Sequence, residues 1–289
     1  MKHIPVLLKE SIDNLKIKPD GIYVDSTVGC GGHAEVIASK LSRQGKLICV
    51  DRDEIAIKEA KKKLVNFNCE IYFFHDNFYN ISNICCCADG ILFDLGICSL
   101  QISDCNRGFS YINDGPLDMR MDKRDRVTAF EIINNFPEKA LNKIIKEYGE
   151  ERFYKLIVKK ILDYRSKKKI ESTLEFADII KNAVPKKILY KSNPAKKTFQ
   201  AIRIFVNYEL SILEESIIKS SSILNNQGKI CVITFHSLED RIIKHSFKKI
   251  CLDDKNFDIV TKKAIYPCLE EINSNSRSHS AKLRVLEKK

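Results

Sequence analysis

Residues 21–33 read GIYVDSTVGCGGH, an apolar run that ends in the acid Asp25 and continues into a glycine-rich turn. The run is typical of a short buried strand, and residues 33–41 after the turn have the pattern of a helix. Glycines in such a turn let the backbone approach a ligand closely, because no Cβ intrudes. The segment therefore predicts a strand, a turn and a helix that together hold a cofactor.

The alternation of strand-like and helix-like segments continues along the chain. Residues 54–64 have a clear helical pattern, with Ile57, Ala60 and Leu64 on one stripe. Short strands that alternate with helices predict a parallel sheet covered on both faces. The further expected strands are residues 46–51, 70–74, 89–94, 229–235 and 281–286.

The middle of the chain has a different pattern, with apolar residues at helical spacing and no convincing strand from about 104 to 199. Ser172 and Glu175 have the spacing of a capping box that opens a helix. A long helix is expected from about 200 to 224, where the sequence NNQG at 225–228 stops it. We therefore predict an α/β sheet domain interrupted by a helical one. The predicted boundaries are 1–104 and 200–289 for the sheet domain and 105–199 for the helical insertion.

The composition is that of a globular protein, since 44% of the 289 residues are hydrophobic and 30% are charged. No apolar run approaches the ~20 residues that span a bilayer, and the N-terminus lacks the apolar core and cleavage site of a signal peptide. We therefore expect a cytoplasmic protein with no membrane contact. The 11 cysteines include no C-x-x-C pair, which favours free thiols in a reducing compartment over disulfides or a zinc site.

Positive charge is concentrated in the middle of the chain. The formal net charge is +11, and residues 139–198 hold 17 Lys or Arg against 7 Asp or Glu, which leaves +10 in that region. A concentrated positive field favours a polyanionic partner. A solvated, lysine-rich helical surface is the alternative, and composition alone does not separate the two.

Three acids, Asp25, Asp51 and Asp94, each end a predicted strand. Because ligands of an open parallel sheet bind beyond the carboxyl ends of its strands, all three should point into one crevice. Asp51 can accept hydrogen bonds from both ribose hydroxyls of an adenosine. Each acid could instead cap the helix that follows it.

Two cofactor classes fit this layout. A dinucleotide prefers G-x-G-x-x-G, with its pyrophosphate at the helix N-terminus, whereas this turn reads G-C-G-G-H. A carboxylate at Asp25 is unfavourable beside a pyrophosphate but favourable beside the cationic methionyl end of S-adenosylmethionine. The turn therefore favours S-adenosylmethionine, and a nucleotide-dependent oxidoreductase remains the alternative enzyme class.

A match to a known family runs in order from His3 almost to the C-terminal end, and seven motifs carry it. They are DSTVGCGGH from Asp25, DRD from Asp51, DLGICSLQ from Asp94, RGFSYINDGPLDMRMD from Arg107, NPAKKTFQAIRIFVNYEL from Asn193, FHSLEDRIIK from Phe235 and RSHSAKLR from Arg277. In this order the chain resembles the ribosomal RNA small-subunit methyltransferase H family. The resemblance implies a Rossmann-like S-adenosylmethionine-dependent methyltransferase sheet with an inserted all-helical domain. It also implies methyl transfer to the exocyclic 4-amino group of a cytidine in the decoding region of small-subunit rRNA.

The same resemblance implies which residues contact the methyl donor. They are Gly31, Gly32, His33, Asp51, Phe78, Asp94 and Gln101. Phe78 can place its ring beside the adenine, with core packing as the alternative. The chain departs from the family where the family usually has Ser, Pro, Pro and Arg, at Cys98, Leu100, Ser276 and His279. Leu100 removes a conformational restraint from the loop that holds Gln101.

The target amine is a poor nucleophile, because its lone pair is delocalised into the cytosine ring. The enzyme must hold it in line with the sulfonium methyl group at about 3–3.5 Å and accept its proton. Asp94, the Ser99 hydroxyl and the backbone carbonyls of 95–97 are the candidate acceptors. The reaction needs neither a metal nor a covalent nucleophile. His236, which follows the strand at 229–235, could relay a proton or could be structural.

Residues 107–122 interleave basic and aromatic side chains, a pattern that suits an RNA base extruded toward the donor. A buried connector is the alternative for this segment. The residues expected to contact RNA are Arg107, Phe109, Arg120, Lys167, Lys168 and Lys169. The expected partner is small-subunit rRNA, naked or in the assembled subunit, bound by a monomer or a homodimer. A non-enzymatic RNA-binding module with a decayed donor site remains the third alternative.

Overall fold

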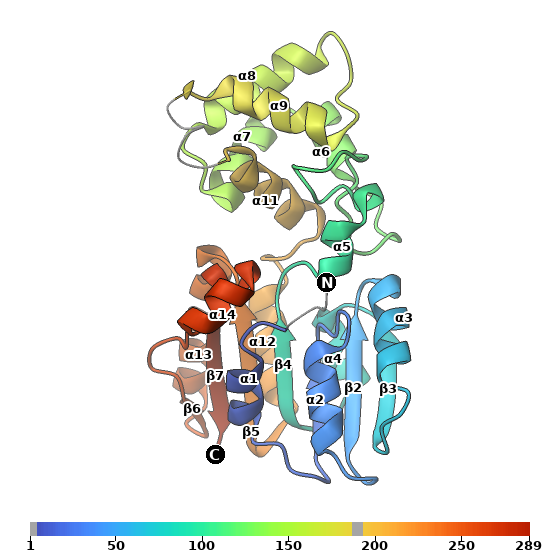
Figure 1. Cartoon of the computed structure of the whole chain (residues 1–289). Coiled ribbons are helices and arrows are strands. Elements are labelled where there is room, and N and C mark those ends of the chain that lie inside the picture. Colours follow the sequence, from blue (N-terminus) through green and yellow to red (C-terminus); the bar gives the residue numbers. More distant parts are fainter. Residues whose placement is uncertain (1–4, 187–192) are drawn as a thin grey trace. The chain divides into compact units, whose positions relative to one another are not determined.

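The structure is a computed structural model that describes residues 5–186 and 193–289. The chain forms two compact units, which we call the sheet unit (residues 1–98 and 210–289) and the helical unit (residues 99–209). The helical unit is thus inserted between two parts of the sheet unit, and Figure 1 shows both.

Seven strands form one sheet in the order β3-β2-β1-β4-β5-β7-β6 (Figure 1). Their bounds are β1 (Ile22–Asp25), β2 (Lys46–Asp51), β3 (Glu70–His75), β4 (Ala88–Asp94), β5 (Leu224–Thr234), β6 (Phe257–Ile259) and β7 (Lys282–Lys288). Strands β1 to β5 pair in parallel, and β7 runs antiparallel to both β5 and β6. The predicted Rossmann-like sheet is confirmed.

The strand sequences explain why both faces of this sheet are covered. In β2, Leu47 and Cys49 join the core cluster on one face, while Ile48 and Val50 join the cluster on the other. Successive side chains of a strand point to opposite faces, so an unbroken apolar run buries both. A sheet of this kind needs helices on each side.

The helices of the sheet unit divide between the two faces. Apolar side chains of α1, α2 and α3 belong to the first core cluster, and those of α4, α12 and α13 to the second. The elements are α1 (Leu8–Leu15), α2 (Gly32–Lys40), α3 (Glu54–Lys63), η1 (Phe78–Asn80), α4 (Ile81–Ile84), α12 (Leu213–Ser222), α13 (Ser237–Asp253), α14 (Leu269–Ser274) and η3 (Ser276–Ser280). In the part of the chain described, no helix is long and apolar enough to cross a membrane.

The strand order reverses between β1 and β4. From β1 the chain adds β2 and β3 on one side, and then β4 and β5 on the other. In open α/β sheets, ligands bind beyond the carboxyl ends of the strands at such a switch point. The crevice expected from the sequence therefore lies where β1 and β4 end.

The helical unit consists of short helices and a long irregular segment, residues 108–128. The helices are α5 (Ser99–Ser103), η2 (Cys105–Arg107), α6 (Ala129–Asn135), α7 (Glu138–Gly149), α8 (Tyr154–Arg165), α9 (Thr173–Ala183) and α11 (Ala195–Val206). Helix α11 packs against α6, α7 and α9, and α8 packs against α7 and α9. Within the described part of residues 104–199 there is no strand, as predicted, and Pro116 and Ser172 form an isolated bridge.

Two predictions near residue 200 were wrong. The single helix expected over 200–224 is two helices, α11 and α12, because the buried Asn207 bonds to the backbone of another segment and Tyr208 adopts a left-handed φ of 54°. The NNQG sequence at 225–228 does not precede β5 but lies within it, where the pairing register with β4 shifts and Gln227 has a φ of 64°. The predicted domain boundary at 199/200 falls inside α11.

Candidate functional site

Asp25, Asp51 and Asp94 are the last residues of β1, β2 and β4. These strands are parallel neighbours, so the three carboxyl groups lie at the same edge of the sheet. Asp25 is almost fully buried, whereas Asp94 keeps 23% of its side chain exposed. The sheet brings together the three acids that the sequence placed at strand ends.

The carboxylates of Asp25 and Asp51 hold the glycine-rich turn. Asp51 Oδ2 accepts a hydrogen bond of 2.8 Å from the backbone N–H of Gly29, and its Oδ1 accepts one of 2.9 Å from that of Asp53. Asp25 Oδ1 accepts from the N–H of Thr27 at 3.3 Å. Each carboxylate oxygen has further lone pairs, so these bonds leave Asp51 able to accept from a ligand as well.

Asp94 differs from the other two acids in its contacts. Its backbone N–H donates to the Thr27 hydroxyl at 2.6 Å, which ties the ends of β1 and β4 together. Its Oδ2 lies 3.6 Å from His33 Nδ1, and Oδ1 is buried without a hydrogen-bond partner in the described part of the chain. A buried, unpartnered carboxyl oxygen is costly, so this atom is suited to a ligand. The contribution of Thr27 was not predicted from the sequence.

The glycines of the turn have different local roles. Gly29 and Gly31 adopt left-handed φ angles of 50° and 74°, and Gly31 is the N-cap of α2. At Gly32, a Cβ would lie 2.4 Å from Pro5 Cγ, so the close packing of the N-terminal segment requires glycine there. His33 is buried, with Nε2 3.1 Å from the carbonyl oxygen of Val6. Backbone conformation and packing therefore also explain the residues of this turn, in addition to any contact with a ligand.

The acids at this edge hold their protons more tightly than ordinary carboxyl groups. Burial raises the pKa of Asp25 to about 7 and that of Asp51 to about 6. The pKa of Asp94 is raised to about 8, first by burial and then by the charges of Asp25 and Glu239. A cationic ligand favours the ionised carboxylates, whereas a pyrophosphate would be repelled by them. The site therefore fits the sulfonium and ammonium groups of S-adenosylmethionine.

The remaining predicted donor contacts lie in both units. Phe78 follows β3 in the sheet unit and packs edge-to-face on Phe93, with ring centroids 5.6 Å apart. Ser99 and Gln101 belong to α5 of the helical unit, where Gln101 is buried. Contacts of Phe78 and Gln101 with a donor stay predictions, and so does the role of the Ser99 hydroxyl as an acceptor for the amine proton.

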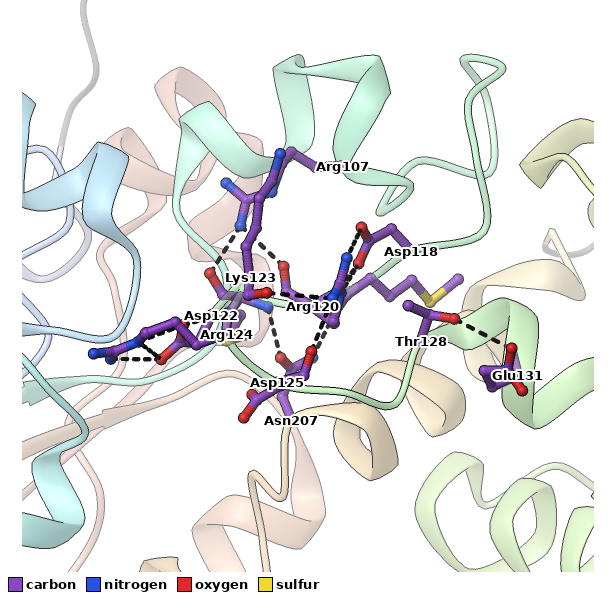
Figure 2. A network of polar contacts seen from close by, with 12 residues as sticks. Arg107, Asp118, Arg120, Asp122, Lys123, Arg124, Asp125, Thr128, Glu131 and Asn207 are labelled. Carbon is purple, nitrogen blue, oxygen red and sulfur yellow. Dashed lines mark hydrogen bonds and ion pairs between the residues drawn. The ribbon is translucent and has the colours of Figure 1, made fainter.

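Arg107 and Arg120 brace the irregular segment of the helical unit (Figure 2). Arg107 is 2% exposed and donates at 2.9 Å to the carbonyls of both Arg120 and Met121. Arg120 donates hydrogen bonds to both carboxylate oxygens of Asp118 at 2.7 and 2.8 Å, and to the Asp125 carbonyl at 2.8 Å. These contacts agree with the interpretation of the segment as a buried connector. A contact of either arginine with RNA stays a prediction.

The remaining residues expected to contact RNA differ in exposure. Phe109 is buried, and the centre of its ring lies 5.9 Å from Arg107 Cζ. Lys167, Lys168 and Lys169 are exposed beyond the end of α8. Lys168 pairs with Glu175 at 3.2 Å, and Lys169 lies 5.7 Å from the centre of the Phe130 ring. The lysine cluster is therefore on the surface, where a polyanion can reach it.

His236 has a structural role at the start of α13. Its Nδ1 accepts from the backbone N–H of Glu239, and its Nε2 lies 3.1 Å from Glu239 Oε1. Glu239 is buried and also accepts from the N–H of Phe235 at 2.8 Å. This reciprocal arrangement resembles a capping box. The charge of Glu239 acts on Asp94, a connection that the sequence analysis missed because the two residues are far apart in the chain.

The strand order, the glycine-rich turn and the acidic edge define the class of S-adenosylmethionine-dependent methyltransferases. The model of the MraW methylase family matches residues 1–289, and the chain belongs to this family. The predicted methyltransferase is confirmed, and the oxidoreductase alternative is excluded.

Relatives and a solved structure agree with this assignment. Proteins named ribosomal RNA small subunit methyltransferase H are 48% identical in Clostridium botulinum (strain 657 / Type Ba4) and 49% identical in Mycoplasma mycoides subsp. mycoides SC, each over 99% of this chain and 99% of the relative. The crystal structure of a candidate rRNA methylase from Clostridium thermocellum, 14% identical, has a TM-score of 0.51 over 99% of this chain and 100% of its own. The structural likeness supports the fold, and the sequence relatives confirm the resemblance.

Proposed function

We propose that this enzyme transfers a methyl group from S-adenosylmethionine to the exocyclic 4-amino group of a cytidine in the decoding region of small-subunit rRNA, in the cytoplasm. The names of the relatives support rRNA as the substrate class. The observation that carries the chemistry is Asp94, whose buried Oδ1 has no partner among the described residues at an edge lined by two further acids. That arrangement offers negative charge and a free acceptor to a cation and an amine.

The sheet unit supplies most of the proposed donor contacts. Asp51 would accept from the ribose hydroxyls, and Phe78 would lie beside the adenine. Asp25 and Asp94 would hold the cationic methionyl end, beside the turn that contains Gly31, Gly32 and His33. Gln101 of the helical unit completes the proposed set. When bound, the donor supplies an electrophilic methyl group on a sulfonium.

Asp94 has a second proposed role toward the target amine. With a cation beside it, Asp94 is ionised and can accept a hydrogen bond from the amine, which restores electron density to its nitrogen. The Ser99 hydroxyl is the alternative acceptor. Exclusion of water from this edge strengthens both interactions. The chain therefore contributes orientation and a proton acceptor rather than a covalent step.

RNA recognition is assigned to the helical unit. The excess of +10 in residues 139–198 supports contact with phosphates. The segment braced by Arg107 and Arg120 would receive the extruded base, beside Phe109. The substrate can be naked rRNA or the assembled subunit, and the enzyme a monomer or a homodimer.

The decisive experiment is turnover with radiolabelled S-adenosylmethionine on unmethylated small subunits and on naked small-subunit rRNA. We expect label in N4-methylcytidine after digestion to nucleosides. The more active of the two substrates identifies the natural one. Label in a different nucleoside would refute the proposed target, and donor binding without turnover on either substrate would point to the non-enzymatic alternative.

A further inference from the structure

A small basic pocket of about 180 Å³ opens on the sheet unit, and none of its lining residues belongs to β1 or β4. It lies between α13 and the β6–β7 edge of the sheet, which neighbour each other in Figure 1. The residues that line it are Lys244, Phe247, Lys248, Ile259, Thr261, Lys262 and Arg284. Four of the seven are cationic and none is acidic, so the pocket is suited to an anion.

The three lysines form the rim of the pocket. Lys244 and Lys248 are one helical turn apart on α13, about 6 Å along its axis, and Lys262 faces them from the segment after β6. All three are exposed, and in the described part of the chain none forms an ion pair or side-chain hydrogen bond. Three unpaired cations around one cavity repel each other, and an anion between them relieves that repulsion.

Arg284 gives the pocket a fixed positive charge at its base. The residue is 9% exposed on β7, and its Nε donates to Asp240 Oδ1 at 2.6 Å. Lys282 Nζ lies 3.0 Å from the other oxygen of Asp240, so one carboxylate is shared by two cations. Arg284, Lys282 and Asp240 together carry a net charge of +1, and their contacts fix the position of the Arg284 guanidinium. Thr261 beside it is fixed by a bond of 2.9 Å from the N–H of Val285.

We propose that this pocket binds a backbone phosphate of the substrate RNA, outside the target nucleotide. The inference rests on the proposed function, because it takes RNA as the substrate. The small cavity admits a phosphate, and the apolar floor of Phe247 and Ile259 provides no hydrogen bonds that could read a base. The pocket therefore contributes affinity and orientation, without sequence specificity. It adds an RNA contact on the sheet unit to those assigned to the helical unit.

The test compares two triple variants of the full-length enzyme. The pocket variant is Lys244→Glu, Lys248→Glu and Lys262→Glu, and the control is Lys9→Glu, Lys40→Glu and Arg43→Glu, three exposed cations of the same unit. Three reversals of two units each lower the formal net charge from +11 to +5 in both variants. RNA affinity is measured by filter binding on a small-subunit rRNA fragment from low to high salt.

We expect the pocket variant to bind RNA roughly tenfold more weakly than the control, with a salt slope smaller by about 1, as for one lost phosphate contact. S-adenosylmethionine affinity and melting temperature should match in both variants. If the charge reversals prevent folding, the same positions changed to Gln give the comparison, with a smaller loss expected.

Equal RNA affinities of the pocket and control variants would overturn the inference. A pocket for free nucleotides would leave RNA affinity unchanged and abolish stabilisation by ATP in the pocket variant, and this result would also overturn it. Failure of the wild-type enzyme to methylate rRNA would refute the proposed function instead, since the affinity comparison does not require turnover.

Discussion

Asp94 combines three properties that the other acids of the edge share only in part. Its Oδ1 is buried without a partner among the described residues, its backbone is tied to Thr27, and its pKa is raised by burial to about 8. A structural N-cap would use its carboxylate on a nearby N–H, as Asp53 does with Ile55 at 3.0 Å. These contacts favour a role of Asp94 toward a ligand over capping of its own helix, and that role stays a prediction.

Asp94→Asn preserves the shape of this side chain and removes its charge. Loss of one transition-state interaction of about 2.7–4 kcal/mol should lower single-turnover methylation roughly a hundred- to a thousand-fold. Melting curves control for stability. Because Asn caps helices about as well as Asp, near-normal turnover would assign Asp94 a structural role and leave Ser99 as the acceptor.

Asp51→Ala should weaken donor binding more than it weakens the fold. The substitution removes the acceptor for the ribose hydroxyls, which should cost roughly 1.5–3 kcal/mol of binding. It also frees the N–H groups of Gly29 and Asp53, so the melting temperature must be measured in parallel. Calorimetry with S-adenosylmethionine provides the affinity, and an unchanged dissociation constant in a folded variant would exclude the contact.

The raised pKa values of about 7 for Asp25 and about 6 for Asp51 predict a pH dependence of donor binding. In the ligand-free protein these groups bind protons that the unfolded chain has released, so the free energy of unfolding falls as pH rises from about 4 through 7. A cationic donor prefers the ionised carboxylates, and its affinity should rise over the same range with release of protons. Calorimetry at pH 6 in buffers of different ionisation enthalpy measures this release, and buffer-independent heats would contradict the prediction.

At the scale of elements, the break between α11 and α12 depends on Asn207. This fully buried amide accepts from the N–H of Met121 and donates to the carbonyl of Met119, both at 2.7 Å (Figure 2). The end of α11 is thereby fixed to the segment that Arg107 and Arg120 brace. One side chain thus holds together two parts of the helical unit that are far apart in sequence.

Asn207→Ala should destabilise the protein by about 2–3 kcal/mol, because it leaves a buried N–H and a buried carbonyl without their partners. Asn135→Ala is the matched control, since Asn135 is exposed and its side chain bonds, among the described residues, only to Glu131 of its own helix. Its cost should stay below about 0.5 kcal/mol. Urea unfolding measures both. Equal urea midpoints for the two variants would show that the hydrogen bonds of Asn207 contribute nothing to stability.

A comparison of individual helices and strands with their expected bounds shows what the sequence could predict. Strands β2 and β3 and helix α3 begin and end close to the expected residues, because their boundaries follow from local apolar patterns. The break at Asn207 was missed because the apolar spacing of α11 and α12 simulates one helix, and the interruption depends on a contact with residues 86 and 88 positions away. The capping box at Ser172 was right in part: Ser172 accepts from the N–H of Glu175, but Glu175 accepts from that of Glu171.

At the scale of the whole molecule, the acids and the excess of positive charge belong to different units. Asp25, Asp51 and Asp94 lie in the sheet unit, and residues 139–198 lie in the helical unit. Motif order predicted the chemistry of the first, because strand ends of a parallel sheet converge wherever their sequences lie. Side-chain contacts such as those that bury Arg107 have no such regularity. The sequence alone therefore could not show whether this arginine stabilises the protein or contacts RNA.

Lys167, Lys168 and Lys169 provide the test of the charged helical unit. Reversal of all three to Glu should weaken RNA binding and lower the salt slope by up to about 2–3, if the cluster contacts phosphates. The control reverses Lys139, Lys143 and Lys159, which are exposed in the same unit and change the net charge equally. Filter binding across salt concentrations distinguishes the two models. A local phosphate site predicts a larger loss in the first variant, whereas equal losses would show that only the overall field matters, and unaltered slopes in both would make this surface a solvated face.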